Sequence, residues 1–258
     1  MGIQERFSLE SKVAAVVGGT GVLGGEFCRG LAGAGAKVAI LGRSAEKGGS
    51  LEAELRAQGH EARFIAVDAR RKADLASARD EITRLWGGVD ILVNAPGINS
   101  ATPFFELGEE EWDQILDTNL KSVLLACQVF GEAMVRRGVG GSVINISSVS
   151  SEIPLSRVLT YSISKAGINS LTRWLARELA PHSIRVNALI PGFFPAEQNR
   201  KILDPERVEA ILRHTPLGRL GVPDELIGTL LWLASPGASG FVTGALIPVD
   251  GGFTAMTI

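Results

Sequence analysis

The sequence has little cysteine, little histidine and no long hydrophobic run, and each scarcity excludes a class of protein. Cys28 and Cys127 lie in apolar helical patterns, which indicates buried thiols and no disulfide scaffold. The three histidines are scattered without the spacing of metal ligands, so we predict no metal site. No apolar run approaches the roughly 20 residues that span a bilayer, and the N-terminal segment has no apolar signal core. We therefore expect a cytoplasmic protein without a membrane partner.

An excess of charge of one sign is also absent. The chain carries 26 Lys and Arg residues against 28 Asp and Glu residues, a formal net charge of −2. Proteins that bind nucleic acid present a surplus of positive charge to the phosphates, so we expect no nucleic-acid partner. The composition is that of an ordinary globular protein, with 45% hydrophobic residues, and the length of 258 residues fits one large α/β domain.

Short β-branched runs alternate with longer helical patterns along the whole chain. Most of these runs are apolar throughout, which is typical of strands that are buried on both faces of a sheet. They lie at residues 12–17, 36–42, 62–68, 89–95, 141–147, 184–190 and 245–251. The alternation predicts a single α/β domain over residues 1–258, a doubly wound, Rossmann-type parallel sheet of about seven strands with helices on both faces.

One segment, residues 193–223, interrupts this alternation. It is polar, contains four prolines, and follows the sixth expected strand at its carboxyl end. Ligands of open α/β sheets bind at that edge, so the segment is a candidate substrate lid. The alternative is a surface excursion that contains a short helix.

Five glycines lie between the first expected strand and the first long helix, in the stretch AAVVGGTGVLGGEF. Glycines at this place allow a tight turn and a close approach to a pyrophosphate, which binds the backbone N–H groups of the helix N-terminus. The stretch reads as G-x-G-x-x-G through Gly19, Gly21 and Gly24. It also reads as G-x-x-x-G-x-G from Gly18, with Val22 in place of the middle glycine. Because a pyrophosphate mainly needs backbone N–H groups, we predict that the turn binds a dinucleotide despite Val22.

The second expected strand ends in ILGRS, where a dinucleotide fold often has an acidic residue for the ribose hydroxyls. Here Gly42 is followed by Arg43 and Ser44, and Arg43 is able to pair with a 2′-phosphate. This favours NADP(H) over NAD(H). The alternatives for Arg43 are an exposed position at a helix start or stacking on the adenine of NAD. The third strand ends at Asp68, which either accepts from the adenine amino group or N-caps the next helix.

The only tyrosine of the chain, Tyr161, lies one helical turn before Lys165, and Ser148 ends the fifth expected strand. A phenol, an ammonium and a hydroxyl beside a nicotinamide form a site for carbonyl reduction. We expect Lys165 and the positive oxidised nicotinamide to lower the pKa of Tyr161 from about 10 toward neutrality. Tyr161 would then act as general acid in reduction and as general base in oxidation, while Ser148 holds the carbonyl oxygen.

These motifs resemble, in order, those of the short-chain dehydrogenase/reductase family along essentially the whole chain. The matching pieces are the stretch from Gly18 to Gly24, VNAPG, DTNL, NISS, YSISK, RVNALIPG and PVDGG. The departures are Val17, Val22 and Pro96, which all concern the cofactor loops. The resemblance implies an NAD(P)-dependent oxidoreductase that interconverts a carbonyl and a secondary alcohol. It also implies a homotetramer, because the DGG tail is typical of tetrameric members.

The resemblance also implies roles for individual residues. Asn119 completes a catalytic tetrad with Ser148, Tyr161 and Lys165 by ordering a water for proton relay, and Lys165 also holds the nicotinamide ribose. The expected cofactor-binding residues are Gly18, Thr20, Gly21, Val22, Leu23, Gly24, Arg43, Ser44, Asp68, Ala69, Asn94, Ala95, Gly97, Tyr161, Lys165, Pro191, Gly192 and Phe194.

The substrate is a small molecule whose identity is less well marked. Several pieces, among them GGTGVLGG, EQNRKIL and HTPLGRLG, resemble a branch of sugar-acid oxidoreductases that act on fructuronate or mannonate. The expected substrate-binding residues are Ser148, Ser150, Arg157, Gln198 and Arg200. One alternative is a 3-oxoacyl-carrier-protein reductase, which needs a basic patch for an acidic carrier protein. The other is a non-catalytic dinucleotide sensor, which needs no Tyr161.

Overall fold

The computed structural model describes residues 2–194 and 204–256, and its centre is one parallel sheet. The strand order is β3-β2-β1-β4-β5-β6-β7, and each pair of neighbouring strands runs parallel. The strands are β1 (Val13–Val17), β2 (Lys37–Gly42), β3 (Ala62–Ala66), β4 (Ile91–Asn94), β5 (Gly141–Ile146), β6 (Ile184–Pro191) and β7 (Leu246–Val249). The predicted seven-stranded, doubly wound parallel sheet is therefore confirmed.

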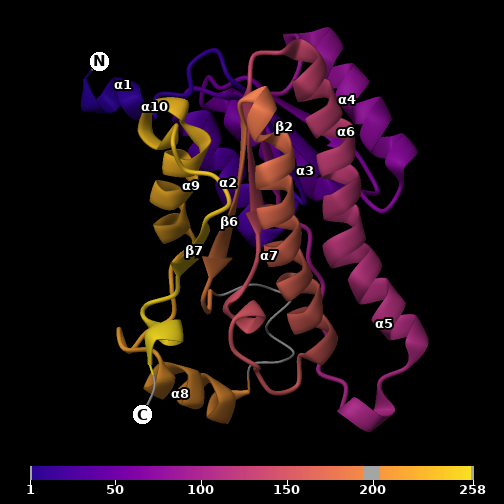
Figure 1. Cartoon of the computed structure of the whole chain (residues 1–258), viewed down its shortest axis with the longest axis vertical. Coiled ribbons are helices and arrows are strands. Elements are labelled where there is room, and N and C mark those ends of the chain that lie inside the picture. Colours follow the sequence, from indigo (N-terminus) through magenta and orange to yellow (C-terminus); the bar gives the residue numbers. More distant parts are fainter. Residues whose placement is uncertain (1, 195–203, 257–258) are drawn as a thin grey trace.

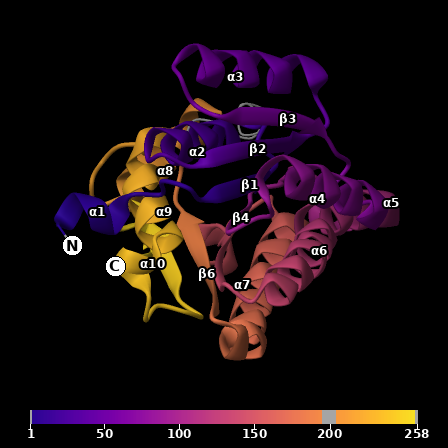
Figure 2. The same ribbon diagram turned by 90° about the horizontal axis from the view of Figure 1, so that it is seen from above.

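Helices cover both faces of the sheet (Figures 1 and 2). One face carries α2, α3 and α9, and the other carries α4, α6 and α7. The α-helices are α1 (Ile3–Phe7), α2 (Val22–Gly33), α3 (Ala45–Ala57), α4 (Lys72–Trp86), α5 (Glu109–Leu116), α6 (Ser122–Arg137), α7 (Leu159–Leu179), α8 (Pro205–His214), α9 (Ile227–Ala234) and α10 (Pro236–Ser239). In the described part of the chain, no helix is long and apolar enough to cross a membrane.

The continuous apolar runs form strands because each strand faces a core on both sides. In β1, Ala14 and Val16 lie in the core under α2, whereas Ala15 and Val17 lie in the core under α4 and α6. Successive side chains of a strand point to opposite faces, so a strand between two helical layers needs apolar residues at every position. All five residues of β1 are buried.

The strand order places a crevice at the carboxyl ends of β1 and β4. The chain proceeds from β1 outward to β3, then returns to β4 on the other side of β1. The loops that follow β1 and β4 therefore diverge, and the space between them is the usual ligand site of such folds. Figure 1 shows α8, from the segment that interrupts the alternation, beyond the carboxyl ends of β6 and β7.

Candidate active site

A cavity of about 400 Å³ opens at the carboxyl edge of the sheet. Most of the residues expected from the sequence line it, although they come from strands, loops and helices far apart in the chain. These lining residues are Gly18, Thr20, Gly21, Val22, Leu23, Gly24, Arg43, Ser44, Asp68, Ala69, Ala95, Gly97, Ser148, Tyr161, Lys165, Pro191, Gly192 and Phe194. The glycine turn and the Tyr161 cluster therefore share one cavity.

The glycine turn at one end of the cavity is packed so tightly that two of its positions require glycine. Gly18 has a φ of +80°, and a Cβ placed on Gly24 would lie 2.1 Å from the Gly18 carbonyl oxygen. Helix α2 begins at Val22, directly after Gly21, and the first N–H groups of a helix have no partner within it. The turn thus presents free backbone donors and the positive end of the helix dipole to the cavity, which fits a pyrophosphate.

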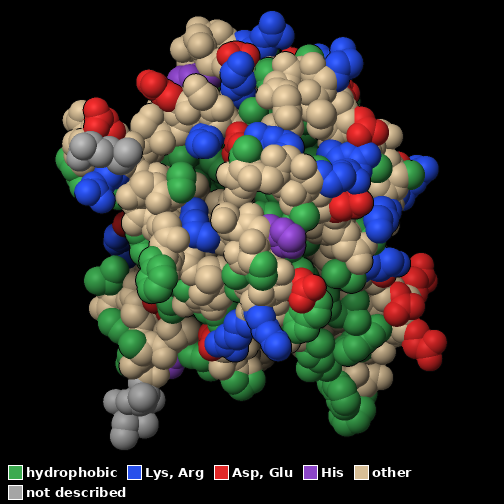
Figure 3. Space-filling model, turned by 45° about the horizontal axis from the view of Figure 1, so that its top comes forward, with side chains coloured by type: hydrophobic (Ala, Val, Ile, Leu, Met, Phe, Trp, Pro, Cys, Tyr) green, Lys and Arg blue, Asp and Glu red, His purple; other side chains and the backbone are tan. Residues whose placement is uncertain are grey.

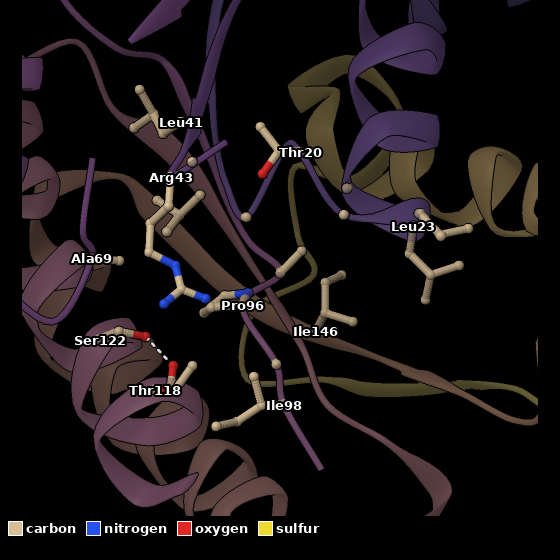
Figure 4. Close-up of a pocket in the computed structure, with 18 of the residues that line it drawn as sticks. Thr20, Leu23, Leu41, Arg43, Ala69, Pro96, Ile98, Thr118, Ser122 and Ile146 are labelled. Carbon is tan, nitrogen blue, oxygen red and sulfur yellow. Dashed lines mark hydrogen bonds between the residues drawn. The ribbon is translucent and has the colours of Figure 1, made fainter. Parts of the chain in front are cut away.

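The Arg43 side chain projects into the cavity from the end of β2 (Figure 4). The preceding Gly42 leaves no room for the acidic residue that often occupies this place. A Cβ on Gly42 would lie 2.5 Å from Thr20 Oγ1, so a side chain there would force the Thr20 side chain to move. The neighbouring carboxylate, Asp68, is bound by Arg70, so the Arg43 guanidinium is suited to an anion in the cavity.

Asp68 lines the same end of the cavity but is bound by a neighbour. Its carboxylate accepts from Arg70 Nε at 2.9 Å and from Arg70 Nη2 at 2.6 Å. These hydrogen bonds lower the pKa of Asp68 to about 2. The alternative that Asp68 N-caps the following helix is wrong, because the N-cap of α4 is Arg71.

Tyr161 and Ser148 meet at the other end of the cavity. Both line the cavity and Ser148 interacts with the Tyr161 phenol, and Lys165 Nζ lies 5.6 Å from the centre of the Tyr161 ring. Lys165 Nζ also donates to the carbonyl oxygens of Ile146 at 2.9 Å and of Pro96 at 3.4 Å. Ile146 is the last residue of β5 and Pro96 lies in the loop after β4, so the ammonium is fixed between these two strands and the tyrosine.

The pKa of Tyr161 departs from the expectation. Burial raises it above the ordinary tyrosine value, and the interaction with Ser148 offsets part of that rise. Lys165 does not offset this rise in the pKa of Tyr161; its ammonium lies over the ring and donates to the Ile146 carbonyl.

Lys165 makes the free energy of unfolding depend on pH in a defined direction. Burial lowers the pKa of Lys165 from 10.5 to about 8. Between these values the unfolded chain binds more protons at this site than the native chain, so native stability rises with pH. We expect the wild type to gain about 1 kcal/mol relative to Lys165→Met between pH 7 and pH 9, as measured by urea unfolding. A difference that does not change with pH would contradict this assignment.

Asn119 does not line the cavity but connects two of its walls. It lies in a π-helical turn, Asp117–Lys121, where the wider turn points its side chain inward. Asn119 Oδ1 accepts from Ile98 N at 2.8 Å, and its Nδ2 donates to Ile98 O at 2.9 Å and to Ser164 Oγ at 3.1 Å. The loop after β4 is thereby joined to α7, which carries Tyr161.

Other expected site residues lie away from the cavity. Asn94 is buried behind it and donates to Asn145 Oδ1 at 2.9 Å. Ser150 is buried against Ser148, and Arg157 is an exposed side chain that pairs with Asp204 at 3.0 Å. Neither is among the residues that line the described cavity, so their role in substrate binding stays a prediction. Gln198 and Arg200 lie outside the described residues.

Several lining residues were not expected from the sequence. Lys47 lies in the first turn of α3, three residues after the N-cap Ser44. This spacing from Ser44 could have predicted that Lys47 lies near the cavity. Thr118 and Ser122 reach the cavity from the helix that contains the π turn, where the Ser122 hydroxyl donates to Thr118 O at 2.6 Å (Figure 4). No local pattern marks these two residues, because only the packing of α6 against the sheet brings them there.

A dinucleotide turn at one end of a cavity and a tyrosine, serine and lysine cluster at the other define an oxidoreductase that uses a nicotinamide cofactor. Comparisons with known proteins agree with this class. The profile of the family described as "Enoyl-(Acyl carrier protein) reductase" matches residues 21–254. The uncharacterized oxidoreductase UxuB of Bacillus subtilis is 39% identical, over 96% of this chain and 96% of its own.

Two further relatives carry more specific names. Gluconate 5-dehydrogenase of Gluconobacter oxydans is 33% identical, over 96% of each chain. A crystal structure of a gluconate 5-dehydrogenase from Burkholderia cenocepacia in complex with NADP and tartrate has a TM-score of 0.95 and 34% identity, covering 99% of this chain and 100% of that chain. This chain belongs to the short-chain dehydrogenase/reductase family and is an NAD(P)-dependent oxidoreductase that acts on CH–OH groups.

Proposed function

We propose that this enzyme interconverts a carbonyl and a secondary alcohol on a sugar acid, with NADP(H) as cofactor and Tyr161 as general acid and base. The observation that carries the proposal is that Ser148, Tyr161 and Lys165 line the same cavity as the glycine turn. The cofactor, when bound, supplies or accepts the hydride. The residues of the chain handle the proton and the developing charge.

In the direction of reduction, Tyr161 donates its phenol proton to the carbonyl oxygen while that carbon gains the hydride. Ser148 donates a hydrogen bond to the same oxygen as negative charge develops on it. The products are a neutral alcohol and a tyrosinate, which then takes a proton from solvent. In oxidation the tyrosinate removes the hydroxyl proton, and the positive oxidised nicotinamide favours this charged form. We propose that Asn119 supports proton relay by fixing the loop at Ile98 against α7.

The names of the relatives support a sugar acid as substrate. One relative is a gluconate 5-dehydrogenase, and the structural neighbour was crystallised with tartrate, another hydroxy acid. Within this class we propose fructuronate or mannonate, from the resemblance of the lid and cofactor stretches to that branch. The segment 193–223 is proposed to cover the substrate, since α8 lies beyond the carboxyl edge and Arg207 donates to Ser156 O at 2.8 Å, shortly before Tyr161.

A panel of aldonates, uronates and 3-oxoacyl thioesters, assayed with both cofactors, tests the proposed substrate class. We expect turnover of at least one sugar acid and none of the thioesters. Turnover of thioesters alone would instead identify a 3-oxoacyl-carrier-protein reductase, for which the exposed Arg173 and Arg177 on α7 are the candidate carrier contacts. Tight cofactor binding without turnover of any carbonyl or alcohol would identify a sensor.

We propose that the enzyme is a homotetramer. Large apolar side chains are exposed at separate places, with Phe105 96% exposed, Trp174 60% exposed and Phe241 fully exposed. Figure 3 shows hydrophobic side chains gathered near one end of the molecule, among interspersed basic and acidic groups. A tetramer with twofold axes would bury more than one surface of each subunit, and exposed apolar side chains at separate places support such an assembly. A monomeric mass in solution would refute the proposal.

A further inference from the structure

In the turn that follows β5, Ser150 makes two contacts with the Ser148 hydroxyl. The Ser150 N–H donates to Ser148 Oγ at 3.3 Å, and the Ser150 hydroxyl oxygen lies 3.1 Å from the same atom. Ser150 is 4% exposed and does not line the cavity. It therefore contacts the active-site serine without reaching the place where a substrate lies.

The contact with Ser150 limits the hydrogen bonds that the Ser148 hydroxyl can still form. A serine hydroxyl has one proton to donate and two acceptor positions. If the Ser150 N–H and hydroxyl occupy both acceptor positions of Ser148 Oγ, its proton is the only group left for Tyr161. Ser148 is then a donor toward the cavity, and it has no position from which to accept the Tyr161 proton.

We propose that Ser150 is a positioning residue that fixes the direction of the Ser148 hydroxyl, so that Ser148 donates toward the reacting oxygen and the Tyr161 proton stays available for transfer. The proposal rests on the proposed function of Tyr161 as general acid and base. A donor chain from Ser150 through Ser148 to Tyr161 also polarises the Ser148 hydroxyl, which makes it a stronger donor to an oxygen that gains negative charge.

The hydroxyls of Ser150 and Ser148 act on the Tyr161 proton separately from the charged groups around it. Lys165, on the same helix, lies over the ring. Glu152, which follows the turn, accepts from Asn169 Nδ2 at 2.6 Å. Removal of the Ser150 hydroxyl changes neither of these contacts.

A neighbouring serine provides a matched control. The Ser151 hydroxyl donates to the Ser148 carbonyl oxygen at 2.6 Å and accepts from Asn169 Nδ2 at 2.8 Å, so it holds the backbone of the same turn. It forms no hydrogen bond with Ser148 Oγ among the described contacts. Ser151→Ala therefore removes a hydroxyl from the turn without altering the acceptor positions of Ser148.

Steady-state kinetics on the intact enzyme give the first test. We expect Ser150→Ala to lower kcat about tenfold, the worth of one hydrogen bond, with little change in KM for the substrate. In the Ser148→Ala background the same substitution should cost nothing further, because Ser150 acts through Ser148. A rise in KM alone would show a substrate contact, and a loss that adds fully to that of Ser148→Ala would show a separate structural role. Either result would overturn the proposal.

The second test reads Tyr161 directly and needs no substrate. Tyr161 is the only tyrosine of the chain, so the ultraviolet difference absorbance of tyrosinate reports this residue alone. We expect a higher pKa of Tyr161 in Ser150→Ala than in the wild type, because a weaker donor stabilises tyrosinate less. Ser151→Ala should leave it unchanged. Equal values in all three proteins would refute the positioning role, whereas an inactive enzyme with the expected shift would refute only the proposed function.

Discussion

Replacement of Tyr161 by phenylalanine is expected to lower turnover about 10³-fold, the usual contribution of a general acid and base. The loss follows because Tyr161 is the only tyrosine of the chain and no other phenol is present to take over the proton. The substitution keeps the ring packed in the half-buried site, so the fold and the cofactor turn should be retained. Initial rates with the sugar-acid panel and a fluorescence titration with NADPH measure the two quantities separately.

We expect a large fall in kcat, with NADPH affinity within about twofold of the wild type. A contact that only held the cofactor would instead change the affinity for NADPH. Full turnover by Tyr161→Phe would remove Tyr161 from the mechanism. A parallel loss of cofactor binding would mean that the hydroxyl mainly holds the cofactor. The hydroxyl of Ser162, which donates to the backbone oxygen of Val158 at 2.8 Å, supplies a control on the same helix as Ser162→Ala.

Replacement of Arg43 by alanine is expected to weaken NADPH binding about 10- to 100-fold and to leave NADH binding nearly unchanged. The guanidinium projects into the cavity at the end of β2, where a 2′-phosphate would distinguish the two cofactors. Hydrogen bonds to charged groups contribute about 1.5–3 kcal/mol each, which corresponds to this range of affinity. Fluorescence titrations of both proteins with both cofactors measure the effect.

Arg70 provides the matched control for Arg43. It lines the same end of the cavity, but its guanidinium is held by both carboxylate oxygens of Asp68. Arg70→Ala should therefore change the preference between the two cofactors much less than Arg43→Ala. Equal losses of NADPH and NADH affinity in Arg43→Ala would instead support stacking of Arg43 on the adenine, the alternative that the sequence left open.

The fold was predictable from the sequence because its causes are local and repeated. A strand that is buried between two helical layers needs apolar residues at each position, and β1 and β6 contain such runs. The glycine turn was equally readable, since the steric reason for Gly24 lies only six residues away, at the Gly18 carbonyl. Four-residue spacing likewise placed Tyr161 and Lys165 on one face of α7.

The direction of individual polar side chains was decided only by the tertiary structure. Ser150 turns toward Ser148 and Arg157 toward Asp204, although the sequence placed both beside the substrate. A buried donor or acceptor takes whichever partner the packing brings within reach, and no sequence spacing specifies that partner. The direction in which the pKa of Tyr161 shifts likewise depends on its burial in the tertiary structure. The sequence by itself determined which groups are present and at which edge of the sheet they lie, whereas burial and hydrogen-bond partners decided what each group does there.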